Sequence, residues 1–230
     1  MVGFPLGGTT AVGARLIEQE TFRRYLDDLL AGRREACRAT VERLLAERVP
    51  IRTLYESLFR DSLYEVGRLW EAGRASVAHE HLATAITEEL LGFVFPHALP
   101  AEEAHRTAVV SCAADEFHQV GGRIVADVLE SAGWDVKFLG ANTPVVELAG
   151  FVRALDPDLL ALSVTVLDHV PAAAAAIRAV RAFAPDLPVA LGGQAFATGG
   201  RELLRELPLV RIVSSLEELE GIARARGGRA

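Results

Sequence analysis

The sequence predicts two regions, an N-terminal four-helix bundle followed by an α/β region with a five-stranded parallel sheet. Three observations predict this. Apolar residues recur at helical spacing through residues 14–99, short apolar runs alternate with helical stretches through residues 107–226, and the intervening residues 96–106 contain two prolines and several charges. We therefore expect a bundle domain over 14–99 and an α/β domain over 107–226.

In the N-terminal region, Gly32, Pro50 and residues 71–76 separate four helical segments, a pattern typical of an antiparallel bundle with short turns. Ser76 is expected to cap the fourth segment. The third segment carries an apolar stripe at spacings of three and four, made of Tyr55, Phe59, Leu63, Val66 and Trp70. We expect this stripe, including Trp70 at its end, to face inward.

The C-terminal region has five short β-rich runs, each followed by a helical stretch. The runs lie at 108–110, 136–139, 159–164, 189–191 and 210–213, and the helical stretches lie near 119–132, 144–154, 170–183, 198–206 and 216–226. This alternation predicts a flavodoxin-like (Rossmann-like) parallel sheet covered on both faces. Such sheets bind ligands beyond the carboxyl ends of the strands, so we expect the functional residues in the loops after the first, third and fourth strands.

Composition and charge exclude several classes of protein. The net charge is −7 and the arginines are scattered among acidic residues, which disfavours direct nucleic-acid binding. The sequence has no apolar run long enough for a membrane span, and the start of the chain, Met1 to Gly13, lacks the pattern of a secretory signal, so we expect a soluble, cytoplasmic protein. Cys37 and Cys112 lie far apart without C-x-x-C spacing and are expected to be free thiols.

His118 is the first candidate functional residue, because it lies in the loop after the first predicted strand. Glu116 lies two positions before it, and Gly121 lies three positions after it. We expect the His118 imidazole to project into the ligand crevice, with the Glu116 carboxylate accepting a hydrogen bond from the ring nitrogen that does not bind a ligand. Gly121 permits a close approach of chain or ligand. Taken alone, such a histidine is more often an ordinary polar contact, so its spacing to other motifs decides the interpretation.

Two further blocks follow Gly121 at set distances. After 41 intervening residues comes Ser163-Val164-Thr165, and after another 26 comes Gly192-Gly193. This pattern resembles the cobalamin-binding domain family, whose motif has the blocks D-x-H-x-x-G, S-x-L and G-G at such distances. This chain has Glu116 where the family usually has Asp, and Thr165 where it usually has Leu. A register using Asp115 as the carboxylate is an alternative, and ordinary strand-end turn chemistry is the alternative for the later blocks.

The resemblance implies that His118 becomes the lower cobalt ligand and displaces the cofactor's dimethylbenzimidazole tail. It also implies that the detached tail enters a deep slot lined by the serine block and the double glycine. The residues of this domain expected to contact the cofactor are Glu116, Phe117, His118, Gly121, Ser163, Thr165, Gly192 and Gly193.

The bundle carries a second motif, because nine residues separate Trp70 from Glu80-His81. This W-x9-E-H spacing is similar to the cap of the CarH-type cobalamin photoreceptors, and the whole resemblance covers roughly residues 14 to 225. It implies that Trp70 packs against the adenosyl group, that Glu80 contacts it, and that His81 takes the vacated cobalt position after light. From the residues alone, the alternative is a core tryptophan and a surface Glu-His dipeptide.

We therefore expect a cobalamin-dependent light sensor, with adenosylcobalamin or another upper-ligand form, and not an enzyme. Such photoreceptors usually begin with a winged-helix DNA-binding domain, and no room for one exists before Ala14, so we expect a separate regulator or effector protein as partner and a homo-oligomeric state. The resemblance to the photocobilin subgroup leaves open biliverdin as a second chromophore. The alternatives are a corrinoid methyl-carrier protein for a methyltransferase system and a degenerate domain that only mediates association.

Overall fold

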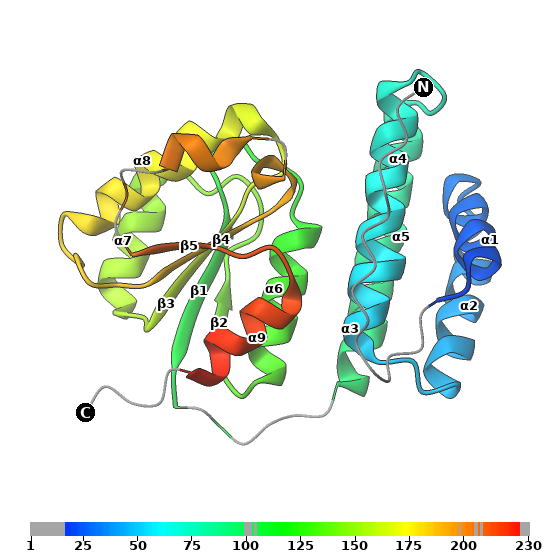
Figure 1. Ribbon diagram of the computed structural model, residues 1–230, viewed down its shortest axis with the longest axis horizontal. Coiled ribbons are helices and arrows are strands. Elements are labelled where there is room, and N and C mark those ends of the chain that lie inside the picture. Colours follow the sequence, from blue (N-terminus) through cyan, green and yellow to red (C-terminus); the bar gives the residue numbers. More distant parts are fainter. Residues whose placement is uncertain are drawn as a thin grey trace. The chain divides into compact units, whose positions relative to one another are not determined.

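The computed structural model describes residues 17–98, 103, 105–197, 199–204, 207 and 209–225. The chain divides into two compact units, Met1–Leu90 and Leu91–Ala230 (Figure 1). The architecture has the predicted fold class, a helical N-terminal region followed by a five-stranded parallel sheet with helices. The chain start, five residues of the predicted linker and the ends of the last two predicted helices lie outside the described residues. Within the described part, no helix has both the length and the apolar character needed to span a bilayer.

The N-terminal unit contains the four expected helical segments. They are α1 (Gln19–Leu30), α2 (Arg34–Ala46), a third segment made of α3 (Ile51–Thr53), a π-helical stretch (Leu54–Arg60) and α4 (Asp61–Glu71), and α5 (Val77–Val94). The backbone N–H of His79 donates to Oγ of Ser76 at 3.4 Å, which confirms Ser76 as the residue that caps α5.

Trp70 differs from its prediction. Phe59 and Val66 are fully buried, as the stripe predicts, but Trp70 is 48% exposed. The difference arises at the end of the helix: Val66, four residues earlier on the same face of α4, is buried, whereas Trp70 lies in the last turn of α4. The prediction that Trp70 faces inward is therefore wrong within this chain, and the indole lies available to a ligand or partner.

The C-terminal unit contains all five predicted strands. They are β1 (Thr107–Cys112), β2 (Asp135–Phe138), β3 (Leu159–Ser163), β4 (Val189–Gly192) and β5 (Val210–Ile212), all parallel in the order β2-β1-β3-β4-β5. Every residue of β3 is buried, as expected for a central strand covered on both faces.

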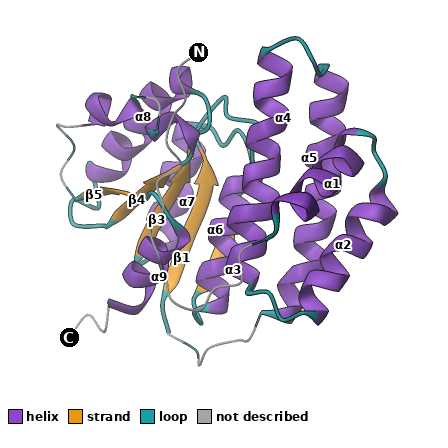
Figure 2. Ribbon diagram, turned by 45° about the vertical axis from the view of Figure 1, so that its right-hand side comes forward, coloured by secondary structure: helices purple, strands orange, loops and turns teal. Residues whose placement is uncertain are grey.

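Four helices cover this sheet. α6 (Val120–Ser131) packs with α9 (Leu216–Ala225), and α7 (Val145–Leu155) packs with α8 (Val170–Arg181) on the opposite face (Figures 1 and 2). The helix predicted near 198–206 is instead a short 3-10 segment, Gly200–Leu204, within the described residues.

Successive strands are added to the sheet in opposite directions on the two sides of the β1–β3 pair: β2 lies beyond β1, and β4 and β5 lie beyond β3. From β1 the chain continues into α6 on one face of the sheet, whereas from β3 it continues into α8 on the other. The loops that follow these two strands therefore separate at the carboxyl edge, where doubly wound sheets bind their ligands. The sheet topology places the loop containing His118 at this edge.

Candidate functional site

The loop after β1 has a fixed conformation that is held by the loop after β2. Asp115 has a left-handed backbone, with φ of 65°, and its amide donates to Oδ1 of Asn142 at 2.8 Å. In return, the amide of Asn142 donates to the carbonyl oxygen of Glu116 at 2.9 Å. The Glu116 side chain is fully buried, whereas Asp115 is exposed. Glu116, and not Asp115, is therefore the carboxylate that contacts the His118 ring.

The Glu116 carboxylate accepts hydrogen bonds at both oxygens. Oε1 lies 2.5 Å from Nδ1 of His118 and accepts the backbone N–H of His118 at 3.0 Å. Oε2 accepts the backbone N–H groups of Thr165 and Val166, at 2.8 and 3.1 Å, and lies 3.1 Å from Nδ1 of His169. One carboxylate thus joins the loop after β1 to the loop after β3 across the point where the strand order reverses.

These donors keep Glu116 ionised. Burial raises the pKa of this carboxyl, but the hydrogen bonds from the side chain and backbone of His118, from the Val166 amide and from His169 outweigh burial and lower the pKa to about 2. An ionised carboxylate only accepts, so Nδ1 of both imidazoles carries a hydrogen. In the neutral His118 ring, the lone pair is then on Nε2, and the side chain is 50% exposed. A ring oriented in this way has the arrangement usual for metal-bound histidines.

Two of the predicted glycines lie where the backbone is closely packed. A Cβ atom at Gly121 would lie 3.1 Å from Oγ of Ser163, so the start of α6 packs directly on the end of β3. A Cβ atom at Gly193 would lie 2.1 Å from the carbonyl oxygen of Val164, and Gly193 has φ of 115°, a conformation that other residues rarely adopt. Gly193 is therefore required by the local backbone.

The remaining predicted residues of this unit lie near the same edge. Ser163 is buried and ends β3, and Thr165 is half-buried. Gly192 accepts the backbone N–H of Val164 at 2.9 Å, which joins the double glycine to the serine block. Phe117 is 69% exposed in the loop after β1. The structure thus brings the three spaced sequence blocks together at the carboxyl edge of the sheet.

Sequence reasoning missed two residues of this network, Asn142 and His169. His169 lies immediately before α8 and binds Glu116, and Asn142 lies in the loop after β2 and binds the Glu116 loop in both directions. For His169 a signal was present, because it is a histidine in the loop after a strand next to the predicted switch point. For Asn142, a lone amide in a loop gave no comparable signal.

Trp70, Glu80 and His81 belong to the N-terminal unit. Trp70 lies in the last turn of α4 and Glu80-His81 in the first turns of α5, so the α4–α5 hairpin places them at the same end. Oε1 of Glu80 accepts a hydrogen bond from the Thr84 hydroxyl at 2.9 Å, and Nε2 of His81 lies 3.6 Å from Oε2 of Glu80. The His81 side chain is 76% exposed.

The same hairpin exposes large apolar side chains. Trp70 is 48% and Val77 49% exposed, whereas Leu82 lies on the same side of α5 as the buried Ile86 and packs toward Gly32. The structure therefore leaves Trp70 and His81 of the second sequence motif exposed.

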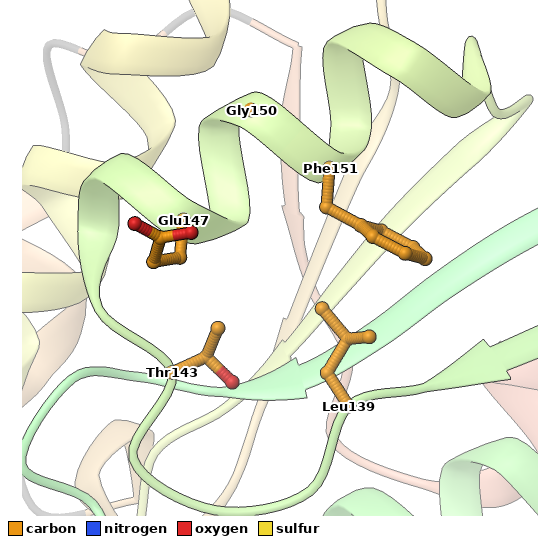
Figure 3. A pocket seen from close by; sticks show the side chains of 5 residues that line it. All are labelled: Leu139, Thr143, Glu147, Gly150 and Phe151. Carbon is orange, nitrogen blue, oxygen red and sulfur yellow. The ribbon is translucent and has the colours of Figure 1, made fainter.

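A pocket of about 380 Å³ lies between α7 and the segment after β2 (Figure 3). Its lining residues are Leu139, Thr143, Glu147, Gly150 and Phe151. None of them was predicted to be functional. Its single carboxylate and its aromatic ring indicate no specific chemistry.

Two family models match the chain, and both are described as a B12 binding domain. One covers residues 106–219 and the other covers residues 21–94. The first match contains the Glu116–His118 network, and the second contains Trp70, Glu80 and His81.

Several curated proteins are similar to parts of the chain. The HTH-type transcriptional repressors CarA and CarH of Myxococcus xanthus are 36% and 32% identical over 136 and 123 residues, which are 58% and 54% of this chain. The matches cover 45% of CarA and 40% of CarH, so the chain spans less than half the length of these relatives. Dimethylamine corrinoid protein 3 of Methanosarcina acetivorans is 26% identical over 140 residues, 60% of this chain and 64% of that protein.

A solved structure has the same fold. The monomethylamine corrinoid protein of Methanosarcina barkeri superposes with a TM-score of 0.73, covering 89% of this chain and 97% of that chain. The sequence identity is 15%, so this likeness concerns the arrangement of the helices and the sheet.

Proposed function

We propose that this chain, whose residues 21–94 and 106–219 belong to the B12-binding domain families, is a cobalamin-dependent light sensor. The family matches indicate that the chain binds a cobalamin or another corrinoid. The observation that carries the proposal is the His118 imidazole, which a buried, ionised Glu116 holds at Nδ1.

The residues at the sheet edge fit a cobalt ligand with a displaced nucleotide tail. In this proposal Nε2 of His118 would bind the cobalt, and Glu116 would fix the ring tautomer and increase the basicity of the ligating nitrogen. Ser163, Thr165 and the double glycine border the tail.

The bundle residues support light sensing as the use of the cofactor. A bound alkylcobalamin supplies a cobalt–carbon bond that visible light breaks. Trp70 offers an exposed indole face to the upper ligand, and Glu80 and His81 lie at the same end of the hairpin. Trp70 packs differently when the upper ligand is present or absent, and this difference shifts the bundle between two arrangements. The changed bundle surface is then read by a separate regulator or by another copy of this chain.

A corrinoid carrier for methyl transfer is the second candidate. It is favoured by the similarity to the dimethylamine corrinoid protein. Such a carrier must expose the upper face of the corrinoid to a methyltransferase, whereas a sensor uses bulky residues there. The exposed Trp70 favours the sensor, because it provides an apolar surface for an upper ligand.

The test is the visible spectrum of the purified chain with adenosylcobalamin, recorded before and after illumination. We expect a bound cobalamin whose spectrum changes on illumination, together with a change in elution from a sizing column. A parallel sample with biliverdin tests for a second chromophore by an absorbance band to the red of cobalamin. The His118→Ala variant should lose the spectral signature of imidazole ligation, and His97→Ala, at an exposed histidine, should keep it.

Each outcome decides between the candidates. Cobalamin binding without any light-dependent change in elution, together with methyl transfer from a supplied methyltransferase, would favour the carrier. An unchanged ligation spectrum in His118→Ala would overturn the assignment of the lower ligand.

A further inference from the structure

The Glu116 carboxylate contacts two imidazoles, and the sequence motif of the family contains only one of them, His118. His118 binds Oε1, and Nδ1 of His169 lies 3.1 Å from Oε2. His169 is half-buried, and it comes from the loop after β3, whereas His118 comes from the loop after β1. The second imidazole therefore binds the same carboxylate from the loop after the neighbouring strand.

We propose that His169 is a positioning residue for His118, which acts by holding Oε2 of Glu116 so that Oε1 stays on Nδ1 of His118. The role in cobalt binding rests on the proposed function. The effect on the orientation and tautomer of His118 does not, because it exists in the protein without cofactor.

His169 lies in a place suited to hold the carboxylate still. It ends the 3-10 turn Leu167–His169, its amide donates to the carbonyl oxygen of Val166 at 3.0 Å, and the next residue, Val170, is fully buried at the start of α8. The carboxylate is thus connected through His169 to the start of a packed helix. The Thr165 and Val166 amides bind the same oxygen from a loop segment.

His169 does not serve its own helix. It occupies the residue before α8, where side chains often cap the helix, but it makes no capping hydrogen bond. Its imidazole binds Glu116 instead. The side chain of His169 thus contacts the carboxylate and not the start of α8.

The chain allows a matched pair of substitutions. In His169→Asn, the side-chain amide places an N–H donor near the position of Nδ1, whereas in His169→Gln the longer side chain places its donor farther from the backbone, near the position of Nε2. The two variants have the same functional group and differ in where the donor lies. His97→Ala is the control, because His97 is exposed and its Nδ1 lies 3.1 Å from the carbonyl oxygen of Phe93.

The first experiment uses the apoprotein with ¹⁵N-labelled histidine and records imidazole NMR spectra. We expect both His118 and His169 to carry hydrogen on Nδ1 in the unchanged protein. The His118 Nδ1–H resonance should shift or broaden in His169→Ala and His169→Gln, and it should be retained in His169→Asn and His97→Ala. If His169 carries its hydrogen on Nε2, or if the His118 resonance is the same in all four variants, the inference is overturned.

The second experiment measures the dissociation constant for cobalamin. Direct partners of metal-bound histidines typically contribute 10- to 100-fold in affinity, so a residue one step further away should contribute about 3- to 10-fold. We expect that loss in His169→Gln, with recovery in His169→Asn. When Glu116→Gln is already present, adding His169→Gln should change the cobalamin affinity by no more than about twofold, because the carboxylate that transmits the effect is gone. An undiminished loss in that background overturns the inference.

The two proposals fail separately. If the unchanged chain binds no cobalamin but the His118 resonance still responds to residue 169, the proposed function fails and the positioning role stands. If cobalamin binds through His118 and residue 169 affects neither the resonance nor the affinity, the positioning role fails alone. If His169→Ala does not fold, the comparison of Asn with Gln decides the result.

Discussion

Oε1 of Glu116 lies 2.5 Å from Nδ1 of His118, and the same oxygen accepts the backbone N–H of His118 at 3.0 Å. The carboxylate therefore fixes both the ring and the backbone of the residue that we propose as the cobalt ligand. Glu116→Gln replaces one acceptor oxygen by a donor and should weaken cobalamin binding about 10- to 100-fold, measured by equilibrium dialysis. Asp115→Asn, at the exposed neighbour, should change the affinity less than about twofold. An equal loss in both variants would contradict the selection of Glu116.

Gly193→Ala should destabilise the C-terminal unit, because the new Cβ atom would lie 2.1 Å from the Val164 carbonyl oxygen in a conformation that favours glycine. We expect a loss of about 2 kcal/mol or more in the free energy of unfolding, measured by denaturant titration. Gly192→Ala is the matched control, since its Cβ would make an ordinary contact of 3.6 Å with the Val213 carbonyl oxygen. Equal stability of the two variants would show that the backbone relaxes freely at Gly193.

Trp70→Ala should separate stability from light response. Because Trp70 is 48% exposed, its removal should cost less stability than truncation of a fully buried aromatic residue, and it should abolish the light-dependent change in elution. Phe59→Ala, at a fully buried position in the same helical segment, should cost about 3–5 kcal/mol. A light response that persists without Trp70 would remove the tryptophan from the sensing mechanism.

The two thiols should be unreactive in the folded protein. Burial, followed by the negative charge of Asp28, raises the pKa of the Cys37 thiol to about 11, and burial with the charge of Glu116 raises the pKa of the Cys112 thiol to about 12. The thiolate is the reactive form, so a disulfide reagent at pH 8 should label neither residue until the chain is unfolded. Cys37→Ser and Cys112→Ser identify any site that does react, and rapid labelling of the folded protein would contradict this burial.

These thiols also give a pH dependence with a definite sign. Their pKa values are higher in the folded than in the unfolded chain, so the folded state binds the thiol hydrogens more tightly. The resulting stability is fully present below the ordinary thiol pKa of 9 and decreases as the pH rises from there through 11 to 12. Cys112→Ser should reduce this decrease between pH 9 and pH 11, measured by denaturant titration. An unchanged profile would assign the alkaline loss to other groups.

Much of the fold was predictable from the sequence because its signals are local. The alternation of short apolar runs with helical stretches predicted all five strands, and it predicted α6, α7, α8 and α9 near their observed positions. Burial at the end of a helix is less local. The stripe holds through Val66, and it fails only at Trp70 in the last turn of α4, because helical spacing does not show where the neighbouring core ends.

The sequence by itself determined which residues follow each strand and how far apart they lie in the chain, and hence the Glu116–His118 pair and the glycine at 193. Only the tertiary structure decided that β1 and β3 are neighbours, that Asp115 lies outside, and that His169 meets the same carboxylate. The physical reason is that spacing and periodicity are encoded over a few residues. Strand order arises from pairing between segments about fifty residues apart, and side chains meet across a crevice only after that pairing is complete.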